Sequence, residues 1–254
     1  LDERVAPYSD PTRPYRQHLK LQGVIARSQV MADVFNKLRQ VAGLNVAVLL
    51  TGPTGTGKTS LARALAESNP GLSGDFVVVD CAAISPTVFE SEMFGHEKGA
   101  FTGADRARDG YIAAAHKGTL FLDEVGELPL EMQAKLLKVL DKEGAYRRVG
   151  STVRRTSDFH LISATNRDLL DMCSKGQFRY DLYARIAQYL IAVPPLSERR
   201  EDIPLIARDC IGRKARQFGI EPRPFSEDAL QWLYRQPWEL NIRDLERAVT
   251  GGLL

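Results

Sequence analysis

Short apolar runs recur along the middle of the chain, each bounded by glycine or by polar residues. They are NVAVLLTG at 45–52, FVVVD at 76–80, TLFLDE at 119–124, FHLISAT at 159–165 and QYLIAV at 188–193. Runs of this kind lack the strict alternation of a strand with one solvated face, and they are typical of strands buried on both faces. The pattern therefore predicts a parallel sheet of five strands.

Helical periodicity appears between these runs and before them. Ahead of the first run, the apolar positions that share one helix face are Val30, Val34, Phe35, Leu38 and Val41. Within EMQAKLLKVLD they are Met132, Leu136, Val139 and Leu140. Because strand and helix alternate along the chain, we expect an α/β fold in which helices flank the sheet.

The strand pattern stops after VPPLSERREDIP, and only helical patterns follow. We expect one helix to begin near 202–204, a second to be capped by Ser226 and a third by Asn241. The domains predicted from this change are a linker or arm at 1–20, with three prolines and no apolar periodicity, an α/β domain at 21–196 and a small helical domain at 197–254. Since the chain stops at AVTGGLL, in or just past a helix, we expect an excised fragment.

Composition narrows the class of protein without naming a function. The chain is 44% hydrophobic and 26% charged, an ordinary globular balance, and its net charge of +2 is too small to indicate nucleic-acid binding by bulk electrostatics. Its three cysteines have neither disulfide nor zinc-site spacing, which fits a reducing cytosol. No apolar run approaches the ~20 residues of a membrane span, and LDERVAPYSD lacks the apolar core of a signal peptide. We expect a cytoplasmic protein.

The segment GPTGTGKT at 52–59 follows the first apolar run and precedes a helical pattern. It matches the phosphate-loop pattern G-x-x-x-x-G-K-[ST], in which glycines let backbone N–H groups point at phosphate oxygens. Lys58 would reach the β- and γ-phosphates of a nucleotide, and Thr59 would hold Mg²⁺. The expected nucleotide-binding residues are Gly52, Pro53, Thr54, Gly55, Thr56, Gly57, Lys58, Thr59 and Ser60. The alternative is a chance glycine-rich turn between strand and helix.

An acidic pair, Asp123 and Glu124, ends the third apolar run. At the carboxyl end of a parallel strand, one carboxylate can bind Mg²⁺ and a second can polarise the attacking water. Adjacent acids alone usually mark only a solvated strand end. Together with a phosphate loop upstream, the pair predicts hydrolysis of a nucleotide with Asp123 on the metal and Glu124 on the water.

The segment KGAFTGADR at 98–106 sets Phe101 between Gly99 and Gly103. Two glycines so close together indicate a tight turn, and turn tips usually carry polar residues. Phe101 is therefore either packed into the core beneath the turn or exposed for a partner. The spacing by itself favours burial.

Taken together, the longer motifs resemble one family. FVVVDCAAISPTVFESEMFGHEKGAFTGA, GTLFLDEVGELPLEMQAKLLKVLDKEGAYRRVG, ISATNRDL, FRYDLYARI and VPPLSERREDIP look like the central domain of sigma-54-dependent transcriptional activators, the bacterial enhancer-binding proteins of the AAA+ class. The similarity covers about residues 22–250, and the hexapeptide GAFTGA is its most specific part. The resemblance implies an AAA+ P-loop domain followed by a helical lid, assembled into a ring that is a hexamer in this family. It also implies that MgATP hydrolysis remodels the closed complex of sigma-54 RNA polymerase holoenzyme and so activates transcription.

The resemblance also assigns roles to single residues. It implies contact with sigma-54 through Gly99, Ala100, Phe101, Thr102, Gly103 and Ala104. Arg179 and Arg185 match arginines that reach a neighbouring subunit's ATP site. Asn166 matches the sensor of the γ-phosphate, and Arg243 matches a second sensor in the lid. DNA contact would reside mainly in a separate domain that this chain lacks, and no membrane contact is implied.

The chain departs from the family pattern at three places. Asp80 replaces an Asn that restrains the catalytic glutamate, WELNIRDLE replaces the usual Pro-Gly before Asn241, and the phosphate loop reads Lys-Thr where Lys-Glu is common. Since an ionised Asp80 cannot donate a hydrogen bond, we expect altered coupling between nucleotide state and the GAFTGA loop. Two alternatives stay open: an AAA+ remodeller of another protein, and a module that binds ATP but hardly hydrolyses it.

Overall fold

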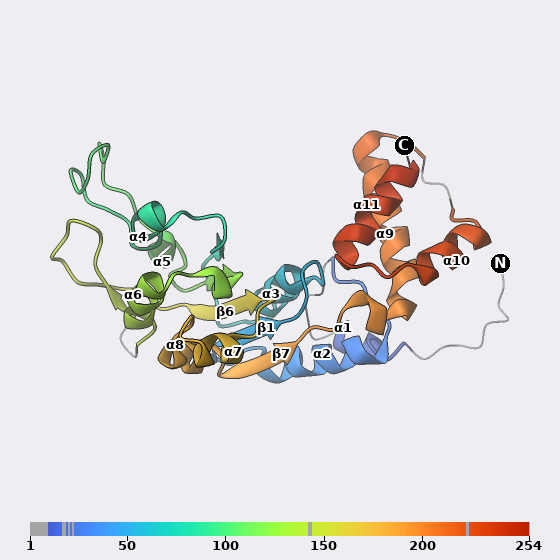
Figure 1. Ribbon diagram of the computed structural model, residues 1–254, viewed down its shortest axis with the longest axis horizontal. Helices are drawn as coiled ribbons and strands as arrows, with labels where there is room; N and C mark the ends of the chain where they lie inside the picture. Colours follow the sequence, from blue (N-terminus) through green and yellow to red (C-terminus); the bar gives the residue numbers. More distant parts are fainter. Residues whose placement is uncertain are drawn as a thin grey trace. The chain divides into compact units, whose positions relative to one another are not determined.

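The computed structural model describes residues 10–16, 19, 21, 23–141, 144–221 and 224–253 of the chain. They form two compact units. Figure 1 labels many of their helices and strands. We call residues 41–51 and 65–191 the sheet unit. The described residues among 1–40, 52–64 and 192–254 are the lid unit. Most of the first long helix and the phosphate loop thus belong to the same compact unit as the C-terminal helices, whereas the division predicted from the sequence lies near residue 197.

A five-stranded sheet with the order β2-β3-β6-β1-β7 is the centre of the sheet unit. Its strands are β1 (Val48–Thr51), β2 (Phe76–Asp80), β3 (Thr119–Asp123), β6 (His160–Thr165) and β7 (Tyr189–Ala192). The β2–β3, β3–β6 and β6–β1 pairs run parallel, with Asp80 in register with Asp123 and Thr51 with Thr165. Each strand lies within one of the five apolar runs, so the predicted parallel sheet is confirmed.

Helices of the sheet unit pack with the central strands into one apolar core. They are α4 (Pro86–Phe94), α5 (Tyr111–Ala114), α6 (Leu130–Leu140), α7 (Leu169–Ser174) and α8 (Tyr180–Ile186), with a 3₁₀ helix at Val125–Glu127. The core includes Leu120 and Leu122 of β3, Met93 of α4, Leu136 of α6 and Leu182 of α8. Because β3 and β6 are buried along almost their whole length, the carboxyl ends of these strands are rigidly placed.

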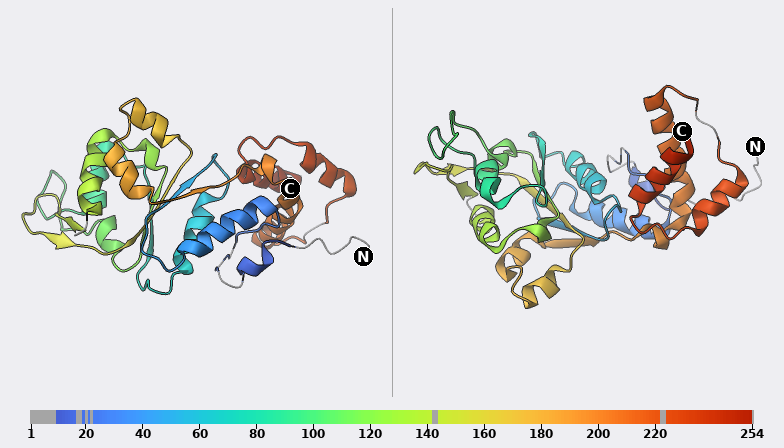
Figure 2. Two further views of the ribbon diagram at one scale, coloured as in Figure 1. Left: turned by 90° about the horizontal axis from the view of Figure 1, so that it is seen from below. Right: turned by 45° about the horizontal axis from the view of Figure 1, so that its top comes forward.

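A small antiparallel hairpin completes the sheet unit. Its strands are β4 (Ala145–Tyr146) and β5 (Arg155–Thr156). The loop between them lies beside the loop that carries GAFTGA, and both project from the same end of the unit (Figure 2).

The lid unit contains α9 (Ile203–Phe218), α10 (Glu227–Arg235) and α11 (Ile242–Leu253), together with α2 (Gln29–Val41) up to residue 40. The phosphate loop at 52–57 leads into α3 (Lys58–Glu67), which begins in this unit. Helix α9 packs against both α10 and α11 (Figure 1). Their shared core includes Leu196, Ile206, Leu233, Trp238 and Leu245. The predicted all-helical C-terminal region is confirmed.

Two of the expected helix starts are confirmed and one cap is wrong. Helix α10 follows Ser226, whose hydroxyl accepts a hydrogen bond from the N–H of Ala229 at 3.2 Å, and α9 begins at Ile203. Asn241 precedes α11, but its side-chain oxygen accepts from the N–H of Leu196 at 2.7 Å. Its φ of 56° is left-handed, whereas an N-cap residue normally has extended backbone. The Asn241 side chain, which the local sequence predicted as a helix cap, is therefore used in a tertiary contact.

The segment assigned to a linker is partly folded in the residues that the structure describes. It contains a helical turn, α1 (Arg13–Arg16), and the hydroxyl of the buried Thr12 donates to the carbonyl of Ala26 at 3.0 Å. Leu19 is buried as well. Residues 1–9 lie outside the described part. Among the described residues, no helix combines the length and the apolar character needed to cross a membrane.

Candidate functional site

The phosphate loop at 52–57 is held from outside by the helical part of its own unit. Three consecutive carbonyls, those of residues 54–56, each accept a hydrogen bond. The donors, in that order, are Asn241 Nδ2 at 2.9 Å, the N–H of Ile242 at 3.0 Å and Arg199 Nη2 at 2.6 Å. In a trans peptide the C=O and the following N–H point in opposite directions. The N–H groups of residues 55–57 therefore point away from these donors.

These amides form a candidate anion site. Within the described residues, no protein atom accepts from the N–H groups of 55–57. They precede the first turn of α3, where the helix dipole adds partial positive charge. Neighbouring N–H groups at a helix N-terminus are suited to phosphate oxygens.

The charged and hydroxyl groups expected around this loop lie at its helical end. Lys58 is only 5% exposed, and its Nζ donates to the carbonyls of Gly52 at 2.8 Å and Pro53 at 3.2 Å. Its ammonium thus lies along the loop itself. Thr59 and Ser60 follow in the first turn of α3 and are exposed.

Gly55 is required by the close approach of the chain before α11. A Cβ at this position would lie 2.1 Å from the carbonyl oxygen of Leu240 and 3.3 Å from the Cβ of Arg243, and φ is +78°. Any other residue would clash with backbone that cannot move independently. The same contact places Arg243, the expected second sensor, directly against the phosphate loop.

The acidic pair lies at the carboxyl edge of the sheet, beside the end of β6. Asp123 is the last residue of β3, and its Oδ1 accepts from the N–H of Glu124 at 3.1 Å. The Oε2 of Glu124 accepts from the N–H of Asn166 at 3.2 Å. Glu124 has φ 51° and ψ 48°, a left-handed conformation that costs a non-glycine residue of order 1–3 kcal/mol. The structure therefore brings Asp123, Glu124 and Asn166 together at this edge of the sheet.

Asp80 uses its carboxylate within its own turn. Its Oδ1 accepts from the N–H groups of Ala82 at 3.0 Å and Ala83 at 3.3 Å. The next residue, Cys81, donates its N–H to the carbonyl of Asp123 at 3.0 Å. Burial, with the neighbouring carboxylates, raises the pKa of the Cys81 thiol, so it remains protonated and uncharged.

The two arginines of FRYDLYARI form ion pairs within the sheet unit. Arg179 precedes α8 and pairs with Asp181 through two hydrogen bonds of 3.0 and 2.7 Å, which lower the pKa of that carboxyl. Arg185, in the last turn of α8, lies 3.3 Å from Asp141. Both guanidinium groups remain partly exposed.

The GAFTGA loop is the tip of a closed hairpin. His96 and Arg108 exchange two backbone hydrogen bonds at its base, and Gly99 N–H donates to the carbonyl of Ala104 at 2.9 Å near its tip. Phe101 is 46% exposed, and its ring meets His96 edge-on with centroids 5.0 Å apart. The burial that spacing alone favoured is wrong, because backbone hydrogen bonds close the base of the hairpin and leave the Phe101 ring in contact with His96 of the hairpin itself.

A clamp of backbone and charge fixes the hairpin to the β4–β5 loop. Glu97 N–H donates to the carbonyl of Val149 at 3.0 Å. The guanidinium of Arg148, which is largely buried, bonds to Glu97 at 3.1 Å and also to Asp109, so it joins both strands of the hairpin. The exposed tip is therefore carried on an ordered base.

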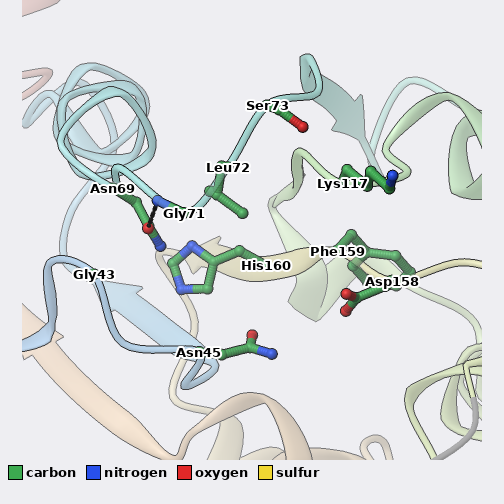
Figure 3. Close-up of a pocket in the computed structure, with 10 residues that line it drawn as sticks. All are labelled: Gly43, Asn45, Asn69, Gly71, Leu72, Ser73, Lys117, Asp158, Phe159 and His160. Carbon is green, nitrogen blue, oxygen red and sulfur yellow. Dashed lines mark hydrogen bonds between the residues drawn. The ribbon is translucent and has the colours of Figure 1, made fainter.

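A hollow of about 350 Å³ lies at the opposite, amino edge of the sheet (Figure 3). The buried imidazole of His160 lies between Asn69 and Asn45 there, with Nε2 3.0 Å from the carbonyl of Val46. Its Nδ1 has no partner among the described residues, and burial lowers the pKa of the ring. Lys117 and Asp158 also line the hollow. Because the lining carries both a positive and a negative side chain, the hollow favours no charge class of ligand.

Sequence reasoning missed three residues that position the expected ones. Arg199 and Asn241 hold the phosphate loop, and the fully buried Gln133 accepts from the N–H of Arg179 at 2.9 Å. Arg199 lies within VPPLSERREDIP, but nothing local in that motif indicates a bond to a loop more than 140 residues earlier. A glutamine on the apolar face of α6 was the one available signal for Gln133.

Comparisons with known proteins agree with this geometry. Residues 24–192 match the model of the sigma-54 interaction domain, and residues 197–253 match that of the AAA+ ATPase lid domain. A Nif-specific regulatory protein of Herbaspirillum seropedicae is 44% identical over 242 residues, which are 94% of this chain and 44% of that protein. The transcriptional regulator NtrC of Azospirillum brasilense is 42% identical, over 89% of this chain and 47% of its own length. The chain thus spans less than half the length of these curated relatives.

Solved structures show the same fold. NtrX from Brucella abortus superposes with a TM-score of 0.84 at 36% identity, covering 91% of this chain and 52% of NtrX. A structure of NtrX in complex with ATP gives a TM-score of 0.82 over 89% of this chain and 49% of that one. The family models cover both the sheet region and the C-terminal helices. The chain therefore belongs to the sigma-54 interaction domain family of the AAA+ class, with an AAA+ ATPase lid domain at its C-terminal end.

Proposed function

We propose that this chain hydrolyses ATP and uses the reaction to remodel a sigma-54 RNA polymerase closed complex. The observation that carries the hydrolytic half is Glu124, held in a strained left-handed conformation at the carboxyl edge of the sheet with its carboxylate bonded to Asn166 N–H. A strained backbone conformation persists only where the surrounding structure maintains it, and such conformations cluster at functional sites. A carboxylate so placed can orient or deprotonate the attacking water.

Nucleotide binding is the role of the phosphate loop. The N–H groups of residues 55–57, which have no acceptor in the described part of the chain, would receive phosphate oxygens. Lys58 would exchange its carbonyl partners for the β- and γ-phosphates. Arg243, whose Cβ lies close to Gly55, would serve as the second sensor. The complexes of NtrX with ATP and with ADP support this assignment.

Mg²⁺ fits the oxygen groups available. The hydroxyl of Thr59 and the carboxylate of Asp123 are hard ligands, and Mg²⁺ typically takes one or two carboxylates in addition to phosphate oxygens. Among the described residues, no group of three or more His, Cys, Asp or Glu forms a metal site of its own. The cation would arrive with the nucleotide and would neutralise charge on the transferred phosphoryl group.

Family membership and exposure support the proposed partner surface and the proposed ring. The hairpin tip at 99–104 presents a half-exposed Phe101, and a large apolar face gives a small contact high affinity. Sigma-54 in the polymerase holoenzyme is its proposed partner. Arg179 and Arg185 would complete a neighbour's site in a homo-oligomeric ring, a hexamer, after leaving Asp181 and Asp141.

The test of hydrolysis uses the purified chain with ATP, with and without Mg²⁺. Glu124→Ala should lower kcat at least 100-fold while nucleotide binding persists, because one carboxylate supplies the base but not the phosphate contacts. Glu131→Ala is the matched control, since this acid on α6 is 74% exposed and lies outside the proposed site. Phosphate release that needs no Mg²⁺, or equal rates in wild type and Glu124→Ala, would contradict the proposal.

The partner is tested separately from the chemistry. Thr102→Ala removes only the hydroxyl and the methyl group of an exposed residue at the hairpin tip, so ATPase activity should persist while opening of a sigma-54 promoter is lost. Retained opening would point to another protein as the target of the remodeller. Tight binding of ATP with almost no turnover would instead favour a nucleotide-gated binding module.

A further inference from the structure

Arg199 carries a guanidinium group that is almost fully buried. It is 2% exposed, its Nη2 donates to the carbonyl of Thr56 at 2.6 Å, and its Nη1 lies 3.3 Å from the sulfur of Met31. Burial lowers the pKa of Arg199, while the charge of the fully buried Asp202 acts in the opposite direction. Asp202 in turn accepts from the N–H groups of Arg27 at 2.6 Å and Ser28 at 2.8 Å. A buried charge persists only where it is paired and hydrogen-bonded.

Asn241 occupies an equally constrained position. It is buried and has a left-handed backbone, which Asn tolerates better than most residues. Both ends of its amide are used, since Oδ1 accepts from the N–H of Leu196 at 2.7 Å and Nδ2 donates to the carbonyl of Thr54 at 2.9 Å. An amide that bridges two backbone segments in this way fixes their separation.

We infer that Arg199 and Asn241 are positioning residues for nucleotide binding, which hold the carbonyls of Thr56 and Thr54 outward so that the amides of the loop face the phosphates. The inference rests on the proposed nucleotide site. Gly55 and Gly57 make the loop's peptides free to rotate, so the orientation of each peptide must come from outside the loop. A peptide turned by half a rotation would present its carbonyl oxygen, and not its N–H, to the phosphate oxygens and repel them.

The two residues also link the loop to the lid. Arg199 lies a few residues before α9 and Asn241 directly before α11, so both bonds run to the phosphate loop from segments that lead into helices of the lid unit. The expected consequence is selective: affinity should fall for ligands whose β-phosphate the loop holds, and not for ligands that lack this phosphate.

Asn241→Asp is the variant that tests the inference most selectively. It keeps the shape, the left-handed preference and the acceptor for Leu196, but it replaces the donor to Thr54 with an oxygen that repels the carbonyl. We expect at least tenfold weaker binding of MgADP by isothermal titration calorimetry, and AMP binding within twofold of wild type by ligand-observed NMR. Asn36→Asp on α2 is the control, because it adds the same charge at a partly exposed site, where the side-chain oxygen accepts from Arg39 Nη2 at 3.1 Å.

Arg199→Lys is the second variant and keeps the buried charge near Asp202. A lysine has no planar fork, so we expect five- to tenfold weaker binding of MgADP, again without an effect on AMP. Unliganded melting temperatures, followed by circular dichroism, verify that both variants fold.

Each outcome decides between the explanations. Wild-type affinity for MgADP in the folded variants would overturn the inference and leave the nucleotide site intact. An equal loss for AMP and MgADP would also overturn it, since that result indicates general damage to the unit. Absence of MgADP binding by the wild-type chain would contradict the proposed function and this inference together.

Discussion

Replacing Gln133 by methionine removes an amide that joins three segments of the sheet unit. Gln133 lies on α6 and is fully buried. Its Nε2 donates to the carbonyl of Leu128 at 2.8 Å and to that of Gln177 at 3.1 Å, and its Oε1 accepts from the N–H of Arg179 at 2.9 Å. The amide therefore connects the segment that follows the acidic pair to the start of α8.

The magnitude follows from these three bonds. At about 1 kcal/mol net for each hydrogen bond, their loss costs about 3 kcal/mol. Burying an apolar methionine in place of an amide returns roughly 1 kcal/mol. We therefore expect Gln133→Met to lower the free energy of unfolding by about 2 kcal/mol, a large share of the 5–15 kcal/mol that is typical of a domain.

Urea unfolding followed by circular dichroism measures this loss. With an m-value of about 2 kcal/mol per molar urea, the midpoint should fall by about 1 M. Gln177→Met is the matched control, because it removes the same kind of side chain from an exposed position and leaves its backbone carbonyl in place. A shift no larger in Gln133→Met than in this control would refute the reasoning.

Gln133→Glu tests the direction of the bonds. The new carboxyl keeps the acceptor for Arg179 N–H but turns an oxygen toward two carbonyls, so its ionised form is disfavoured in the folded state. The folded pKa of this glutamate is then raised above its unfolded value, and the variant should gain stability relative to wild type as pH falls. A loss of stability that is the same at pH 8 and pH 5 would contradict this assignment.

Three further predictions follow from the described contacts. Burial lowers the pKa of His160 below its ordinary value of 6.5, so the unfolded chain binds more protons at this residue than the folded chain does. The free energy of unfolding should therefore fall as pH drops below about 6.5. Urea titrations at pH 7.5 and 5.5 should show this loss in wild type and not in His160→Gln. Phe101→Ala should change stability by less than about 1 kcal/mol, since the ring is half exposed, yet abolish sigma-54 binding in a pull-down; retained binding would remove the aromatic tip from the contact. Asp80→Asn keeps an acceptor for Ala82 and Ala83, so it should fold normally but change the ATPase rate or the nucleotide-dependent binding of sigma-54; unchanged values of both would exclude coupling through Asp80.

Much of the candidate site was predictable because its signals are local. The phosphate loop is recognised from glycines and Lys58 at fixed spacing, and its place after a strand follows from the apolar run that precedes it. Asp123 and Glu124 were predicted at the edge of the sheet, since a strand that is apolar throughout must end where its first charged residues emerge. The conformation of Glu124 and its bond to Asn166 could not be read in this way, because they depend on how β3 and β6 align.

Phe101 illustrates the limit of spacing rules. Two glycines around an aromatic predict a turn but say nothing about what lies beneath it. The backbone bonds between His96 and Arg108, together with the clamp of Arg148, hold the base of the hairpin against the β4–β5 loop. These contacts decide which side of the turn faces solvent. The family resemblance supplied the correct expectation of an exposed tip, whereas local sequence favoured the wrong one.

The sequence by itself determined the strands, the helices and the chemistry at the ends of the strands. Burial on both faces of a strand, the period of a helix and the glycines of a loop are properties of a few neighbouring residues. Only the tertiary structure decided which side chains hold that chemistry in place. Arg199 and Asn241 meet the phosphate loop across 143 and 187 residues, and Gln133 meets Arg179 across 46. Such bonds depend on the path of the chain, and no local pattern of residues encodes them.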